Sequence, residues 1–304
     1  MQEVAGLLRS TIPNNSFFDV KSEESKNQYL NHLNLICKLT GIENDELDQI
    51  KTHKVKVEDD TFILINNLPN KIWSSLPIQS HEIVKTTPKI ENIVTTALQH
   101  LQKNHFYAYE LIKEFVHSIV YVKLKTDFTG QDSQITSSSF PIMPLSIFIS
   151  DKAGFHIPPN NISKDISHRF VAENIYHEAI HQVINMNILL FDIFNENFDS
   201  KYSPKIEIPW RYNQVKRNQY WELDRAYHAT IVYSRVLRYR INELRDESLL
   251  AFEKNIFEGA VKSGVDAVTH LIKSLEQYKS YFSANGQEQL DILHEDIKQV
   301  LKSF

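Results

Sequence analysis

The sequence predicts a mostly α-helical protein with one small β element that comes directly before a long central helix. Only 7 of the 304 residues are glycine, a low share that disfavours turn-rich β structure. Apolar residues recur at helical spacing over long stretches, whereas the alternation typical of a strand is confined to one short segment. The composition, 42% hydrophobic and 23% charged, is that of an ordinary globular protein with an ample core.

The first part of the chain is predicted to be largely helical. Residues 1 to about 60 have apolar positions at helical spacing, residues 61–79 form a looser connection, and residues 89–122 return to helical spacing. We therefore expect a helical N-terminal region over residues 1–125 and a second domain over residues 126–304.

The β element and the central helix follow. Residues 145–150 alternate like a strand, after a serine- and proline-rich loop over residues 137–144. A helix is then expected from about residue 168, capped by Ser167 or Asp165, because neither proline nor glycine interrupts the chain there. Residues 191–220 are irregular, and helical spacing resumes over residues 219–254 and 255–304, with a break at residues 283–286.

The central helix carries the motif HExxH, formed by His177, Glu178 and His181. Positions four apart lie on the same face of a helix, so both imidazoles can reach one metal ion with the carboxylate beside them. This spacing supplies two ligands of a catalytic transition-metal site. A chain with 13 histidines can produce the motif by chance, but the uninterrupted helical context favours a metal site.

Charge and cysteine content exclude several classes of function. The formal net charge is −5, so nothing suggests a surface for nucleic acid, and the apolar runs are too short to span a membrane. The single cysteine, Cys37, rules out an internal disulfide and fits a reducing compartment. No secretion signal is recognisable at the N-terminus, and we expect a cytoplasmic protein.

A catalytic metal usually has three protein ligands and an open position, so a third ligand is needed. The metzincin pattern HExxHxxGxxH is disfavoured, because Ile184 and Asn187 stand where its glycine and third histidine belong. Glu196 resembles the glutamate ligand of thermolysin-like enzymes, but its surroundings lack helical periodicity. His228 is the better candidate, since it lies on a long predicted helix with Asp224 one turn before it.

Several segments together resemble a known family. A serine-rich loop and strand lead to the run Val171–His181, followed by Ile208-Pro209-Trp210-Arg211 and by a helix that contains Tyr227-His228. This order, over about residues 135–240, resembles the HExxH-type α-ketoglutarate-dependent peptide β-hydroxylases, which modify ribosomally made peptides. The combination is more specific than HExxH alone.

The resemblance implies a non-haem Fe(II) centre held by His177, His181 and His228, with the remaining coordination positions open for the keto acid and oxygen. Arginine gives bidentate recognition of a carboxylate, so the residues implied for binding the distal carboxylate of α-ketoglutarate are Arg235, Arg211 and Arg225. Glu178 would be an acceptor beside the ligands. The implied substrate is a peptide or amino acid hydroxylated at an unactivated side-chain carbon, and the N-terminal region would bind a leader peptide or brace the core.

Two alternatives stay open. In a zinc-dependent HExxH metallopeptidase, Glu178 would be the general base that deprotonates metal-bound water, with His228 or Glu196 as third ligand. HExxH as such favours this alternative, whereas the lack of a recognisable third-ligand pattern counts against it. In a helical binding protein with a relic site, metal removal would change neither the fold nor partner binding.

Overall fold

The computed structural model describes residues 50–126, 135–140, 143, 145–158, 161–190, 192–212 and 218–303. Helices make up 56% of these residues and strands 18%, so the predicted predominance of helix is confirmed. The described chain forms two compact units, which we call the sheet unit (residues 50–182) and the helical unit (residues 183–303). The helical expectation for residues 1–49 lies outside the described residues.

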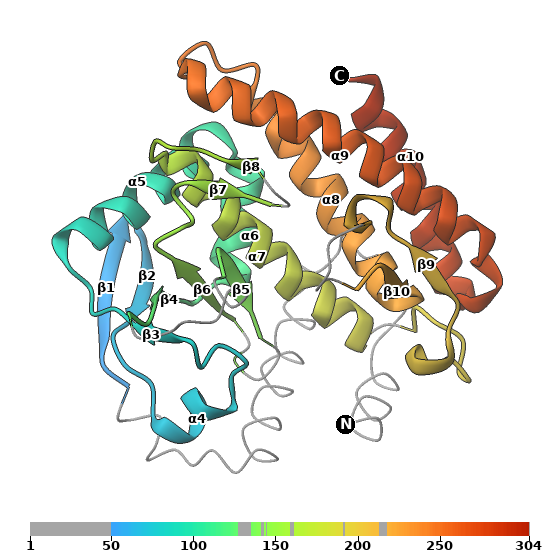
Figure 1. Cartoon of the computed structure of the whole chain (residues 1–304), viewed down its shortest axis with the longest axis horizontal. Coiled ribbons are helices and arrows are strands. Elements are labelled where there is room, and N and C mark those ends of the chain that lie inside the picture. The colour runs from blue at the N-terminus through green and yellow to red at the C-terminus, as the bar shows by residue number, and fades with distance from the viewer. Residues whose placement is uncertain are drawn as a thin grey trace. The chain divides into compact units, whose positions relative to one another are not determined.

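The sheet unit is built on a mixed sheet of six strands (Figure 1), which is larger than the small β element that the sequence predicts. The order is β1-β2-β4-β6-β5, and β3 pairs with β4 beside this path. The pairs β2–β4 and β4–β6 are parallel, whereas β1–β2, β3–β4 and β5–β6 are antiparallel. The strands are β1 (Thr52–Val57), β2 (Asp60–Ile65), β3 (His81–Ile83), β4 (Ser118–Leu124), β5 (Ser137–Ser139) and β6 (Ser146–Ser150).

Four of these strands correct the helix or loop that the sequence predicts, and β5 is the one that lies in the predicted serine- and proline-rich loop. β1 was expected to be helical, β2 to be a loose connection, and β4 to be the end of a helix. The buried strand β4 is rich in isoleucine and valine, and a short apolar run of this kind fits a strand or a buried helix equally well by periodicity. β1 and β2 form a hairpin through Glu58, whose φ of 52° is the left-handed conformation of a tight turn.

Helices and short connections complete the sheet unit. α5 (Pro88–Asn104) begins where the Thr87 side chain accepts a hydrogen bond from the backbone of Ile90, with a proline in its first turn. α6 (Phe106–Phe115) follows it directly and leads into β4. The short helix α4 (Asn70–Ser75) carries Trp73, which packs against the core cluster formed with Val120 and Phe148. A small hairpin, β7 (His156–Ile157) and β8 (Asn161–Ile162), precedes the next helix.

That next helix, α7 (His168–Leu190), is the central helix of the sequence analysis. Ser167 caps it, since its Oγ accepts a hydrogen bond from the backbone of Arg169 at 3.1 Å. Every residue from Phe170 to Tyr176 is buried, so this first part of the helix is enclosed on all sides as a core helix rather than amphipathic. The structure thus confirms the expected helix and its start, whereas the hairpin of β7 and β8 separates it from the predicted strand, which is β6.

The helical unit contains three long helices that pack against one another (Figure 1), namely α8 (Leu223–Glu243), α9 (Ala251–Gln277) and α10 (Ala284–Lys302). The predicted break near residues 283–286 is confirmed, because α10 starts where Ser283 caps the backbone of Gly286 at 3.0 Å. A two-stranded sheet of β9 (Lys205–Glu207) and β10 (Tyr220–Glu222) leads into α8. Single-turn helices lie at η1 (Ser200–Tyr202), η2 (Pro209–Arg211) and η3 (Lys279–Tyr281).

The boundary between the units falls after Gln182, and not at residue 125 as the sequence suggested. The reason is the sheet itself. β4 ends at Leu124 and pairs along its length with β6, so the segments on either side of residue 125 belong to one sheet. The role proposed for the N-terminal region, substrate or leader binding or bracing, stays a prediction.

Within the part of the chain that the structure describes, no helix combines the length and the apolar character that a membrane crossing requires.

Candidate metal centre

A stripe of polar side chains attaches α7 to the edge of the sheet. Asn174, Glu178 and Gln182 follow one another at intervals of one helical turn, and each is at most 3% exposed. The Gln182 amide donates to the backbone oxygen of Ser146 at 3.1 Å and accepts from the backbone of Leu145 at 3.4 Å. Since buried polar groups must be hydrogen-bonded, this stripe fixes the rotation of α7 against β5 and β6.

Asn174 closes the stripe at its N-terminal end. Its amide nitrogen donates to the backbone oxygens of His156 at 2.8 Å and Ala153 at 3.2 Å, and its oxygen lies 3.1 Å from Ser137 Oγ. One side chain thus connects α7 to β5, to β7 and to the loop before β7.

Glu178 occupies the middle of the stripe and is held by two serines of β5. Ser137 Oγ donates to Glu178 Oε1 at 2.7 Å, and Ser139 also donates to the carboxylate. Burial raises the pKa of Glu178 to about 7, while the two serine hydrogen bonds oppose the rise. Glu178 is therefore a buried carboxyl that changes charge near neutral pH.

The two histidines of the motif lie on the adjoining stripe of α7. His177 Nε2 and His181 Nε2 are 2.9 Å apart, and both side chains are half-buried. Together with a carboxylate oxygen of Glu178, these nitrogens form a group whose ligand atoms all lie within 4.8 Å of one another. The local arrangement that the sequence predicts for His177, Glu178 and His181 is confirmed, and it is a group that could hold a metal ion.

The predicted third ligand belongs to the helical unit. His228 lies on α8 and is half-buried, and its role as a ligand stays a prediction. Asp224, one turn before it, accepts a hydrogen bond from Ser200 Oγ at 2.7 Å, so η1 engages the carboxylate expected to orient His228 or water. Glu196, the alternative ligand, is exposed in the irregular segment before η1.

The three arginines expected to bind the keto acid differ in their surroundings. Arg235 Nη1 is 3.8 Å from Asp296 Oδ2 of α10, so a carboxylate of the protein already faces it. The guanidinium groups of Arg211 and Arg225 lie over the ring of the buried Trp221, 4.7 and 5.1 Å from its centre. The structure brings these two arginines together on one indole, whereas Arg235 forms part of the packing of α8 on α10.

Sequence reasoning missed the residues that hold the motif in place. The Asn174-Glu178-Gln182 stripe was visible as three polar residues at intervals of four, beside a second polar series that contains the two histidines of the motif. Ser137 and Ser139 were visible only as alternate residues of a serine-rich segment, and nothing local connects them with Glu178.

No protein-family model matches the chain, and no curated protein matches it significantly.

Proposed function

We propose that the protein is a non-haem Fe(II)/α-ketoglutarate-dependent oxygenase that hydroxylates an unactivated side-chain carbon of a peptide or amino acid. The observation that carries the proposal is the convergence of His177 Nε2 and His181 Nε2, 2.9 Å apart on a fixed core helix. The resemblance of residues 135–240 to HExxH-type peptide β-hydroxylases supports iron rather than another metal.

The donor set fits a divalent transition metal. Imidazole nitrogens bind such ions at about 2.1 Å, and two ligands at adjacent positions of an octahedron then lie about 3 Å apart. The observed separation of 2.9 Å agrees with this spacing, although a hydrogen bond between the rings gives a similar distance. His177 and His181 would hold the ion, and His228 is the third ligand that we propose.

When bound, Fe(II) would couple the oxidation of α-ketoglutarate by O2 to substrate hydroxylation. The products are succinate, CO2 and the hydroxylated substrate, so one oxygen atom enters succinate and the other enters the new hydroxyl group. Arg211, Arg225 and Arg235 remain the candidates for the distal carboxylate, and the first two lie together over the ring of Trp221.

In this proposal Glu178 is a positioning residue. Its carboxyl is 3% exposed and receives hydrogen bonds from Ser137 and Ser139, so it ties the histidine-bearing turn of α7 to β5. A carboxylate engaged in this way holds the neighbouring imidazoles in register with the sheet edge.

An extended peptide is the substrate form that β5 favours. The backbone N–H of Ser150 donates to the backbone oxygen of Thr136. Opposite residues of an antiparallel ladder alternate between hydrogen-bonded and non-hydrogen-bonded pairs, so Thr136–Ser150 and Ser138–Phe148 are hydrogen-bonded pairs. The backbone groups of Ser137 and Ser139 therefore point to the far edge of β5, where no other described strand pairs with it. A peptide could add there as a further strand, directly beside Glu178.

A zinc metallopeptidase is the second candidate, and one observation favours it. Burial raises the pKa of Glu178 to about 7, the range that suits a general base at neutral pH, and its oxygen lies within 4.8 Å of the histidine nitrogens. With zinc, Glu178 would take the proton of a water that attacks the scissile carbonyl.

Anaerobic reconstitution with Fe(II) and α-ketoglutarate tests the proposal. We expect a weak visible charge-transfer band, and succinate after oxygen is admitted. Both should disappear in His177→Ala and His181→Ala, and His228→Ala tests the third ligand. His53→Ala, which replaces a half-exposed histidine of β1 outside the motif, is the matched control and should keep both. Tight zinc binding with no such band would instead favour the metallopeptidase.

Glu178→Gln separates the two enzyme classes. A peptidase should lose nearly all peptide cleavage, because its base is gone. An oxygenase should keep its metal and much of its α-ketoglutarate turnover, since glutamine still accepts hydrogen bonds from the serines. Loss of succinate formation in a folded, metal-loaded Glu178→Gln protein would count against the positioning role.

A further inference from the structure

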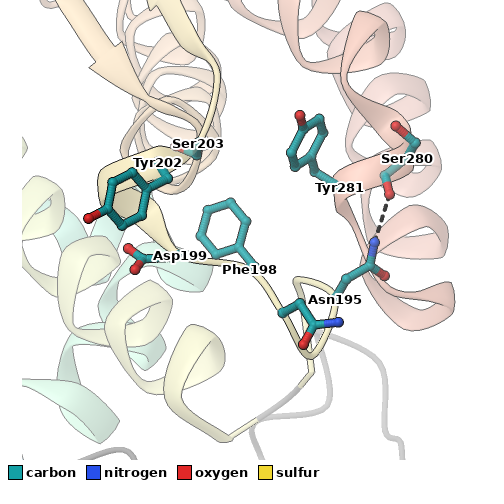
Figure 2. Close-up of a pocket in the computed structure, with 8 residues that line it drawn as sticks. Asn195, Phe198, Asp199, Tyr202, Ser203, Ser280 and Tyr281 are labelled. Atoms are coloured by element: carbon teal, nitrogen blue, oxygen red, sulfur yellow. Dashed lines mark hydrogen bonds between the residues drawn. The ribbon is translucent and has the colours of Figure 1, made fainter.

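The helical unit contains a pocket that takes no part in the metal centre. Its volume is about 630 Å³, large enough for a side chain together with part of its backbone. Figure 2 shows the rings of Tyr202 and Tyr281 on opposite sides of Phe198, with Asp199 beside Tyr202. The described lining residues are Asn195, Asn197, Phe198, Asp199, Tyr202, Ser203, Ser280 and Tyr281.

The walls of this pocket are fixed by hydrogen bonds between distant segments. The Asn195 side chain donates to the backbone oxygen of Ser280 at 2.7 Å, and its backbone donates to the oxygen of Tyr281 at 3.1 Å. These bonds attach the loop before η1 to η3, so the two tyrosine-bearing walls keep their spacing.

Aromatic packing fixes the floor. Phe194 stacks on Phe198 with ring centres 4.1 Å apart and planes at 17°, and it also bridges to Phe282 through its backbone. Phe282 is fully buried. The pocket is therefore preformed, which lowers the entropic cost of binding.

The chemistry of the lining suits a cation. None of the described lining residues is lysine or arginine, and Asp199 is the only acidic one among them. Asp199 Oδ1 accepts from the backbone of Lys201 at 2.9 Å, which fixes the carboxylate at the start of η1. Tyr202 and Tyr281 are 77% and 41% exposed, so their rings are accessible to a ligand.

One ring of the pocket already holds a positive charge. Lys201 Nζ lies over the Tyr202 ring, 5.4 Å from its centre. A cation over an aromatic ring is attracted by the ring quadrupole, so a cationic ligand could take the place that Lys201 Nζ holds over Tyr202.

We propose that this pocket binds the cationic side chain of a lysine or arginine in a peptide. The aromatic walls would pack against the aliphatic stem, Asp199 would pair with the charged end, and the Asn195 and Asn197 amides would accept or donate at the peptide backbone. This inference does not depend on the metal, so it can fail while the proposed function stands, or the reverse.

The test is a titration of the full-length, metal-free protein followed by NMR. The probes are Nα-acetyl-lysine amide and Nα-acetyl-arginine amide, with Nα-acetyl-norleucine amide as the uncharged control. We expect saturable shifts confined to the pocket residues, with the charged probes binding several-fold more tightly. Equal affinity for norleucine would overturn the proposal. Cadaverine, a free diamine without a peptide backbone, is a further probe. If it binds as tightly as the lysine probe, the pocket binds free amines, and the claim that its ligand is a peptide side chain is overturned.

Variants sharpen this test. Asp199→Asn removes the charge but still caps η1, and it should weaken the lysine probe by about 3- to 5-fold. Tyr202→Leu should weaken it by a similar factor. Glu196→Gln, an exposed carboxyl of the same loop outside the lining, is the matched control and should leave the affinity unchanged. If Glu196→Gln and Asp199→Asn weaken binding equally, general charge rather than the pocket attracts the probe.

Discussion

At the scale of single residues, Glu178 is where the metal motif and the sheet meet. It lies between two histidines in sequence, yet its hydrogen bonds go to Ser137 and Ser139 of β5. The same carboxyl therefore attaches α7 to β5, and its partners set the orientation of the turn that bears the two histidines.

Replacing Ser137 with alanine removes a donor from this buried carboxylate. We expect the free energy of unfolding at pH 8 to fall by about 1–2 kcal/mol, since an ionised buried acceptor loses a partner. Urea unfolding measures the change. Ser138→Ala is the control, because its side chain points to the opposite face of β5. Similar losses in both variants would mean that the effect comes from the strand and not from Glu178.

His81 gives a pH-dependent stability. It is fully buried in β3, where its Nε2 accepts from the backbone of Ile135 at 3.3 Å. Burial lowers the pKa of His81 below its ordinary value of 6.5, while Asp151 opposes the shift. The unfolded chain therefore binds a proton more readily than the folded one, so this contribution is complete above pH 6.5 and is lost as the pH falls through the folded-state pKa.

We expect His81→Gln to flatten the decline of unfolding free energy between about pH 7 and pH 5. Urea unfolding at a series of pH values measures the slope. His53→Gln, a half-exposed histidine of β1, should leave the slope as in the natural protein. An unchanged slope in His81→Gln would show that other groups cause the acid sensitivity.

The residues of the site could be predicted from the sequence where neighbours in sequence set their geometry, and could not where distant segments set it. His177, Glu178 and His181 were predictable, because their mutual geometry follows from one turn of helix. Ser137 and Ser139 were not, since their contact with Glu178 depends on how α7 rotates against a strand about 40 residues away, as set by Asn174 and Gln182.

At the scale of elements, the start of α10 depends on a close backbone approach. A β-carbon added at Gly286 would lie 1.8 Å from the backbone oxygen of Ile193, so only glycine fits there. This contact holds the start of the loop that lines the pocket, at Ile193, against α10.

We expect Gly286→Ala to lower the free energy of unfolding by about 2–3 kcal/mol, because the backbone oxygen cannot move aside cheaply. Gly264→Ala is the matched control. Its β-carbon would meet only the side chain of Leu237, with Cδ1 nearest at 3.2 Å, and alanine favours helix by about 1 kcal/mol, so this variant should be neutral or stabilised. A Gly286→Ala protein as stable as the natural one would contradict the close approach.

Elements were predicted well where their pattern was long and poorly where it was short. α7 and the helices after residue 220 have enough turns to show their period. The break between α8 and α9 falls at residues 244–250, however, and not after residue 254 as the sequence predicts. β1, β2 and β4 have six or seven residues each, and such runs do not distinguish a strand from a buried helical segment. What decides in favour of strands is pairing between segments far apart in sequence, as in β2 with β4.

At the scale of the whole molecule, metal binding should stabilise the fold, because a ligand that binds only the folded state shifts the unfolding equilibrium. With free Fe(II) at 100 times its Kd under anaerobic conditions, we expect a gain of about 2.7 kcal/mol. Thermal or urea unfolding with and without the metal measures it. The double variant His177→Ala/His181→Ala should show no gain, whereas His53→Ala should keep it. A gain that survives the double variant would place the metal elsewhere.

The two units also carry separate optical reporters. Of the three tryptophans, Trp73 lies on α4 in the sheet unit, whereas Trp210 and Trp221 lie in the helical unit, where the latter is covered by two guanidinium groups. Intrinsic fluorescence can therefore be assigned by substitution. With Trp73→Phe, emission follows the helical unit alone. With phenylalanine at both other positions, it follows the sheet unit that bears the histidine pair, so each half of the molecule can be timed as it unfolds.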